Sequence, residues 1–123
     1  MEKVRPKLPD SLTEGELKEE ELFQNKVLRP VIKMQHDVLI LRLKSYFASK
    51  RVMFNVMDKK KRVLAIEQSF ASDNAFKKEI QGMILGQLNT SEYKLYLKYE
   101  RTMNKRIIQI VRNRMLDAIL QLA

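Results

Sequence analysis

The sequence predicts an all-α fold, and two observations support that prediction. Helix breakers are scarce, because no proline follows Pro30 and only Gly82 and Gly86 interrupt the rest of the chain as glycines. Apolar residues recur with helical spacing, and no segment alternates with the period of two that a strand needs. We expect a bundle of about five helices, with a kinked N-terminal helix at Pro30 and a long C-terminal helix. Residues 1–12 are expected to form a flexible tail, and residues 13–123 a single domain.

The first half of the chain is expected to form two helical segments that meet near Pro30. A capping box, with Thr13 as N-cap and Glu16 three residues later, starts a helix that runs to about Leu28. Pro30 then either kinks this helix or occupies the first turn of a new one, because proline has no N–H to donate. The segment from Pro30 to about Ala48 is apolar over most of its circumference, which is typical of a central helix.

Polar caps divide the second half of the chain. Ser49–Met57 forms a connector or a short helix, and Asp58 then caps a helix that begins directly after it. Residues 72–74, with the sequence SDN, end that helix and cap the next one. A second capping box, Asn89–Glu92, starts a helical pattern that continues without interruption to about Leu122. At about 1.5 Å per residue, this last helix would be roughly 50 Å long.

The composition excludes several classes of functional site. The 14.6 kDa chain has no cysteine, which excludes disulfides, iron–sulfur clusters and thiol nucleophiles, and its single histidine excludes a multi-histidine metal site within one chain. No apolar run approaches the roughly 18 residues of a membrane span, and the sequence MEKVRPKLPD lacks the apolar region of a signal peptide. We therefore expect a cytoplasmic protein that is not an enzyme and binds no cofactor.

The net charge of +9 is unevenly distributed. Residues 1–21 carry four basic and seven acidic side chains, a net charge of −3, so residues 22–123 carry +12. A body this basic attracts polyanions such as nucleic acid, and the acidic segment is a candidate to dock on it and mask it. The alternative is that the charge merely keeps a small protein soluble.

Two basic clusters are candidate phosphate-binding sites. If the last helix is continuous, five residues share a stripe about 60° wide and about 27 Å long that contains no acid: Lys94, Lys98, Arg101, Lys105 and Arg112. The second cluster, Lys59, Lys60, Lys61 and Arg62, lies at an expected helix start, where positive charge opposes the helix dipole. Either cluster could equally be a solvated helix face.

Three polar residues are candidates for burial. Glu100 and Asn104 are one turn apart on the apolar side of the last helix, where a carboxylate needs a structural partner; a catalytic acid is the alternative. His36 lies among apolar residues and is expected to be half-buried and hydrogen-bonded. A di-iron site is not indicated, because the residue three before His36 is Lys33 rather than glutamate.

Gly82 and Gly86 lie on one side of a predicted helix, beside its apolar face. Each glycine costs about 1 kcal/mol of helix stability relative to alanine, so a structural reason is expected. We expect a close approach of another helix backbone at this point, with fraying near the helix end as the alternative.

Several short strings of residues resemble a family of small all-helical proteins from Bacteroidetes bacteria. These strings are Phe23–Asn25, Leu28–Lys33, Gly86–Leu88, Glu92–Tyr96 and Asn104–Arg106. The resemblance covers residues 18–120 or so and implies a bacterial source and an all-helical fold, but no activity. Some similar chains carry the label "glyoxalase" by automatic transfer. Glyoxalases hold a divalent metal with several histidines and glutamates on β-containing folds, which one histidine and no strands cannot build.

The function expected first is that of a non-enzymatic helical protein that assembles with itself or with a partner through its apolar helix faces. A 50 Å helix would exceed the roughly 30 Å diameter of such a domain, so we expect a dimer or larger oligomer. The alternative function is binding of a nucleic-acid phosphate backbone by the basic stripe.

Overall fold

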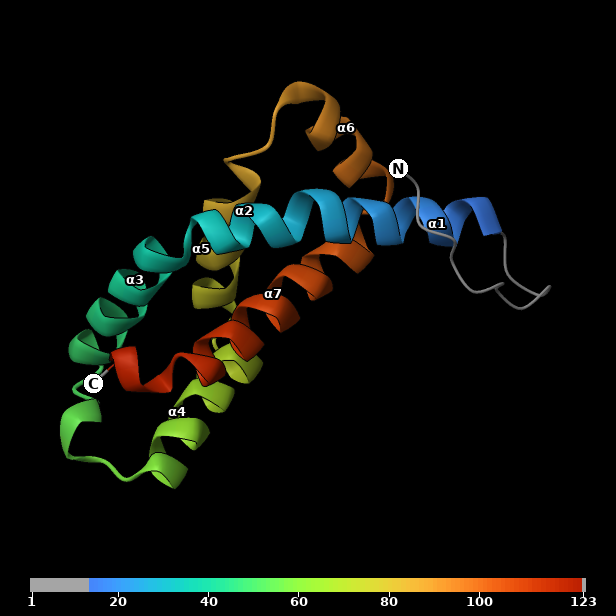
Figure 1. Ribbon diagram of the computed structural model, residues 1–123. Helices are drawn as coiled ribbons and strands as arrows, with labels where there is room; N and C mark the ends of the chain where they lie inside the picture. Colours follow the sequence, from blue (N-terminus) through green and yellow to red (C-terminus); the bar gives the residue numbers. More distant parts are fainter. Residues whose placement is uncertain (1–13, 123) are drawn as a thin grey trace.

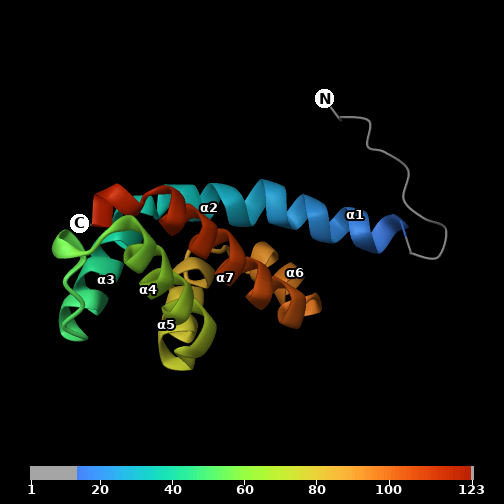
Figure 2. The same ribbon diagram turned by 90° about the horizontal axis from the view of Figure 1, so that it is seen from below.

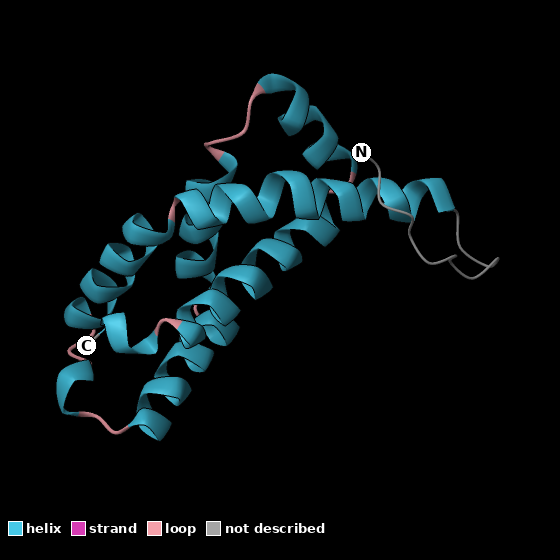
Figure 3. Ribbon diagram, in the orientation of Figure 1, coloured by secondary structure: helices cyan, strands magenta, loops and turns pink. Residues whose placement is uncertain are grey.

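The computed structural model describes the backbone of residues 14–122 and the side chains of residues 18–122. Within these residues it contains helices and no strand, so the predicted all-α fold is confirmed (Figures 1 and 3). The N-cap predicted at Thr13 and the tail predicted for residues 1–12 lie outside the described residues. The elements in chain order are α1 (Glu14–Phe23), a π-helical turn (Gln24–Leu28), α2 (Arg29–Met34), α3 (His36–Ser49), a 3₁₀ turn (Phe54–Val56), α4 (Lys59–Ser72), α5 (Asn74–Leu85), α6 (Thr90–Lys98), α7 (Glu100–Asp117) and a final 3₁₀ turn, η3 (Ile119–Leu122).

The N-terminal rod, α1 to α2, runs through Pro30 without a break (Figures 1 and 2). The π-helical turn makes this possible, because the Arg29 N–H donates to the Gln24 carbonyl, five residues back instead of four. Pro30 then lies in the first turn of α2, where its missing N–H costs least. Of the two predicted alternatives for Pro30, the kink is therefore wrong, and the place in the first turn of a new helix is confirmed. The chain bends instead at Gln35 (φ −87°, ψ 7°), so the single helix expected from Pro30 to Ala48 is divided into α2 and α3.

The segment after α3 combines both predicted alternatives, a connector and a short helical turn. Arg51 has φ 59°, the left-handed conformation that ends many helices, although glycine or asparagine usually occupies that place. The 3₁₀ turn that follows buries Phe54, whose ring stacks on Phe47 with a centroid separation of 4.6 Å. The connector is thus fixed to the core by an aromatic side chain.

Both caps predicted around α4 and α5 are confirmed. Asp58 accepts a hydrogen bond from the Lys61 N–H at 2.9 Å and starts α4. Asp73 accepts one from the Phe76 N–H at 3.1 Å and starts α5. Asp73 also accepts a hydrogen bond from the Tyr46 hydroxyl at 2.6 Å, so the α4–α5 turn is tied to α3.

The long C-terminal helix predicted from the second capping box is wrong in its continuity. The capping box itself is present, with Asn89 and Glu92 each accepting from the other's backbone N–H. At Tyr99 (φ −123°, ψ 31°), however, the helix breaks into α6 and α7. The Tyr96 hydroxyl donates to the Asn104 side-chain oxygen at 2.7 Å, although eight residues of unbroken helix would span about 12 Å. The bend at Tyr99 brings these two residues together.

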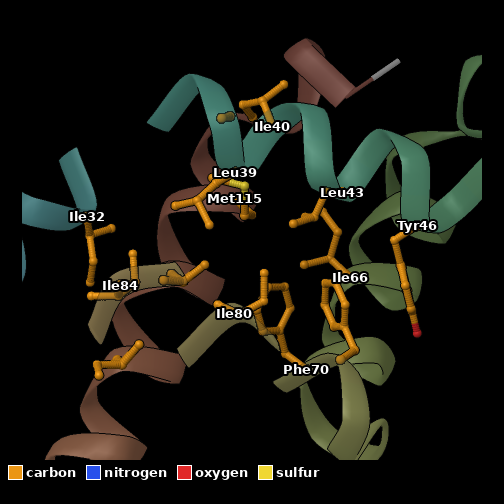
Figure 4. Close-up of a cluster of buried hydrophobic side chains, with 14 of the residues drawn as sticks. Ile32, Leu39, Ile40, Leu43, Tyr46, Ile66, Phe70, Ile80, Ile84 and Met115 are labelled. Carbon is orange, nitrogen blue, oxygen red and sulfur yellow. The ribbon is translucent and has the colours of Figure 1, made fainter. Parts of the chain in front are cut away.

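α7 occupies the centre of the molecule, which corrects the prediction that the apolar helix now called α3 is central. It packs against α2, α4, α5, α6 and the π-helical turn. Its core residues Met103, Ile107, Val111 and Met115 are at most 1% exposed. Figure 4 shows Met115 beside Leu39 of α3, with Ile66, Ile80 and Ile84 lining the same cluster. With 18 residues, α7 is about 27 Å long, so the argument from helix length to an oligomer no longer holds.

None of the helices in the described part of the chain combines the length and apolar character required to cross a membrane.

Candidate phosphate-binding surface

The five residues of the predicted basic stripe lie on two helices. Lys94 and Lys98 belong to α6, whereas Arg101, Lys105 and Arg112 belong to α7, which runs in a different direction after the break at Tyr99 (Figure 1). The single straight stripe is therefore absent. Only Arg101, Lys105 and Arg112 still share one helix, α7.

Lys98 forms an ion pair with Glu19 of the N-terminal rod. Its ammonium lies 2.9 Å from a Glu19 carboxylate oxygen, to which the Tyr99 hydroxyl also donates a hydrogen bond. The Tyr99 hydrogen bond, and then Lys98, hold the pKa of Glu19 below its usual value. The hydrogen bond between Lys98 and Glu19 in turn raises the pKa of Lys98. Lys98 is thus less available to an external phosphate than the basic residues of α7.

A groove of about 520 Å³ lies between α5 and α7, and basic and carboxamide side chains line it. Three lysines and four amide side chains line it, with one apolar residue, and no described carboxylate takes part. The lining residues are Asn74, Lys77, Lys78, Gln81, Asn104, Lys105, Ile108 and Gln109. We call this site the α5/α7 groove.

The polar groups of the α5/α7 groove are only partly used within the protein. Lys77 donates to the Ala71 carbonyl at 3.2 Å, and Gln81 donates to the Asn104 carbonyl at 3.3 Å. Lys78 and Lys105 form no hydrogen bond or ion pair with another described residue, and both are exposed. The Asn104 oxygen accepts from Tyr96, which leaves the amide N–H groups of Asn104 free to donate. The groove therefore offers positive charge and neutral donors together, which is the chemistry that phosphate oxygens require.

A second groove, of about 260 Å³, lies on the other side of α7, against α2 and the π-helical turn. It contains three arginines, Arg29, Arg106 and Arg114, and one acid, Asp117. Gln109 lines both grooves, so the outer ridge of α7 separates them. The α7 ridge also carries Arg101, which is exposed, and Arg112, which is half-buried and donates to the Asn113 side chain at 3.3 Å.

The second predicted cluster, Lys59, Lys60, Lys61 and Arg62, lies in the first turn of α4. The three lysines are exposed and Arg62 is half-buried. In both views the start of α4 lies far from α6, at the opposite end of the molecule (Figures 1 and 2). The two sequence clusters therefore do not combine into one surface with Lys94 and Lys98.

The three residues predicted to be buried have different environments. Glu100 is exposed, so that prediction is wrong, because α7 begins at Glu100 and its carboxylate faces solvent. Asn104 is half-buried and joins Tyr96 to Gln81. Burial, followed by the charge of Glu100, raises the pKa of Tyr96. Among the described residues, no group of three or more metal-ligating side chains is present.

His36 is half-buried and connects α3 to the end of the described chain. The Arg114 Nε–H donates to His36 Nδ1 at 2.9 Å, and His36 Nε2 lies 3.0 Å from the Gln121 side-chain oxygen. Since a guanidinium only donates, His36 Nδ1 accepts from Arg114, which leaves Nε2 to donate to the Gln121 oxygen. His36 therefore has the role of a structural clamp.

The predicted close packing at Gly82 and Gly86 is wrong. Both glycines are exposed, and a Cβ built on Gly82 meets no atom within 4 Å. A Cβ on Gly86 would meet the Gly82 carbonyl of the same helix at 3.1 Å. Gly86 is the C-cap residue of α5 and lies at the end of the helix, not at a contact with another helix.

Sequence reasoning missed Lys77, Lys78 and Arg106 as part of the basic surface. Their own helices carry a recognisable signal, because Lys77 and Lys78 directly follow the buried Phe76 and thus flank the face that packs on α7. That α5 lies beside α7 cannot be read from either helix alone.

Comparisons of the chain with protein-family models, with curated proteins and with solved structures give no match. The resemblance to small helical proteins of Bacteroidetes stays a prediction.

Proposed function

We propose that the protein is a non-enzymatic binding module whose partner is the phosphate backbone of a nucleic acid. The observation that carries this proposal is the α5/α7 groove, where Lys77, Lys78 and Lys105 meet four carboxamides and no described carboxylate. Exposed helix faces usually mix charges of both signs. A groove whose charged side chains are all cationic favours an anionic occupant.

The α7 ridge extends this site into a surface. Arg101 and Arg112 continue it along the helix, and Arg29, Arg106 and Arg114 line the groove on the other side. The helix is about 27 Å long, which matches about eight base-pair steps of duplex at roughly 3.4 Å each. A row of cations of this length suits a repeating polyanion better than a single small anion.

The uneven charge of the chain supports the same partner. Residues 22–123 carry a net charge of +12, which raises the local concentration of any polyanion. Among the described residues no side chains are arranged to read base edges, so we propose binding with little sequence preference.

The experiment that tests this proposal is a fluorescence-anisotropy titration of the full chain with labelled duplex and single-stranded DNA and RNA. We expect binding at about 50 mM salt that weakens steeply as salt is added. With about five phosphates neutralised, the log–log slope on duplex is expected to be about −4 to −5. Absence of binding at tens of micromolar protein would contradict the proposal.

A pair of charge-matched variants separates the groove from net charge. Lys78→Glu with Lys105→Glu is expected to weaken duplex binding at least tenfold and to make the slope shallower by about two. The control, Lys59→Glu with Lys60→Glu, changes the net charge by the same amount at exposed sites on α4, outside both grooves. Equal losses for the two variants would show that net charge alone attracts the nucleic acid.

A further inference from the structure

The outer face of α3 exposes apolar side chains. Leu41 is 66% exposed and Val38 is 47% exposed, and the exposed Ser45 and Ala48 lie on the same face. At about 100° per residue, these four residues fall within an arc about 80° wide. The arc is opposite the buried side chains of the same helix, Leu39, Leu43 and Phe47. A helix at the edge of a monomer ordinarily carries charged residues on its outward face.

One flank of this face carries two opposite charges. Asp37 and Lys44 are seven residues apart and point in nearly the same direction around the helix, about 20° apart. Both are exposed, and neither forms a hydrogen bond or ion pair with another described residue. On the other flank, Arg42 is already paired with Glu79 of α5 at 3.0 Å. Of the charged side chains of α3 that border the apolar face, Asp37 and Lys44 are therefore the two without a partner among the described residues.

This arrangement is complementary to itself. When two copies of α3 lie antiparallel about a two-fold axis beside Leu41, equivalent flanks lie on the same side of the interface. Asp37 of each copy then faces Lys44 of the other, Leu41 faces its own equivalent, and Val38 faces the small side chain of Ser45. In a parallel two-fold arrangement equivalent flanks would lie on opposite sides of the interface, so Asp37 and Lys44 would not meet.

We propose that the outer face of α3 binds a second copy of this chain, as an antiparallel two-fold dimer. The occupant is indicated by the charge complementarity of Asp37 and Lys44, which an unrelated partner would match only by coincidence. The apolar patch is small, so the dimer belongs to the weak class of interfaces, with a dissociation constant in the micromolar range. This proposal does not depend on nucleic-acid binding, because no lining residue of either α7 groove lies on α3.

The test is analytical ultracentrifugation of the full chain, freed of nucleic acid, between about 5 and 500 µM. We expect the average mass to rise with concentration from the monomer value of 14.6 kDa towards twice that value. Leu41→Glu is expected to abolish the rise while the helical circular dichroism is unchanged. The control, Leu64→Glu, alters an exposed leucine on α4 and is expected to leave the dimer intact.

A charge exchange tests the antiparallel geometry. Asp37→Lys alone and Lys44→Asp alone are each expected to weaken the dimer at least fivefold, since each places like charges together. The double variant, Asp37→Lys with Lys44→Asp, is expected to restore it. A monomer at every concentration, an equal loss in Leu64→Glu, or no restoration by the double variant would each overturn the proposal.

Discussion

Two helix joints of this molecule, at Pro30 and at Tyr99, reverse what their residues suggest. At Pro30, which ordinarily breaks a helix, α1 and α2 form one rod, because a π-helical turn supplies the Arg29 N–H with the carbonyl of Gln24. At Tyr99, where no proline or glycine is present, the helix breaks. Whether the helix continues through a joint thus depends on which hydrogen bonds its backbone and side chains form there. At Tyr99 the bend allows the Tyr96–Asn104 and Tyr99–Glu19 contacts to form.

The largest effect is expected at the π-helical joint, where Phe23 and Leu28 are both buried although they are five residues apart. Phe23→Ala removes a ring that is 2% exposed, at an expected cost of about 3 kcal/mol. Urea denaturation measures the change. Lys26→Ala, at an exposed residue of the same turn, is the control, with less than about 0.5 kcal/mol expected. Equal stability of Phe23→Ala and the wild type would mean that the joint does not depend on this buried ring.

At the other joint, Tyr96→Phe removes the hydroxyl that donates to Asn104. The expected loss is about 1 kcal/mol, since Tyr96 is buried and one hydrogen bond is lost. Tyr93→Phe, at a residue that is 41% exposed, is the matched control and should be neutral. Thermal denaturation compares them. If both variants match the wild type, the Tyr96–Asn104 bond does not hold the bend.

Glycine is the second kind of helix breaker, after proline, and Gly82 lies inside α5 without interrupting it. Gly82→Ala is expected to stabilise the protein by about 0.5 to 1 kcal/mol, since the added methyl group meets nothing within 4 Å. Gly86→Ala should gain less, because its Cβ would lie 3.1 Å from the Gly82 carbonyl. A lower melting temperature for Gly82→Ala would show that this side of α5 is covered.

The smallest effect is expected from acid at the Tyr99 joint. Because the Tyr99 hydroxyl and Lys98 lower the pKa of Glu19 in the folded state, its contribution to stability is present above the usual value of 4.5. That contribution is lost as the pH falls below 4.5 and through the lowered pKa. Arg29 at the other joint donates to Asn25, a neutral acceptor. Melting temperatures of the wild type and Glu19→Gln should therefore converge on acidification, and a constant difference would contradict this.

The caps were predictable from sequence and the bends were not. Asp58, Asp73 and Asn89 cap helices through backbone groups three residues away, so the whole interaction lies in a local pattern. The bend at Gln35 coincides with a side-chain contact of 3.5 Å to the Met83 carbonyl, 48 residues away. The bend at Tyr99 likewise coincides with the hydrogen bond from the Tyr99 hydroxyl to Glu19, 80 residues away. No local pattern contains such partners.

In the candidate site, too, local patterns were predictable and contacts between distant residues were not. Lys105 and Arg112 were predicted because they share a face within one helix, and this part of the stripe lies on α7. The predicted continuation through Lys94 and Lys98 depended on a straight helix and is absent from the structure. Lys77 and Lys78 join Lys105 only because α5 packs beside α7, which tertiary contacts decide.

The clamp at His36 has a consequence for the kinetics of folding. Most contacts in this fold join residues that are close in sequence, and such contacts form quickly because little chain entropy is lost in each one. The contact between His36 and Gln121 instead closes a loop across 85 positions of sequence. Docking of η3 on α3, with Ile119 and Leu122 entering the core, is therefore expected to be a late event. Amide protons of η3 and of the first turn of α3 should then exchange together, and faster than those of α7.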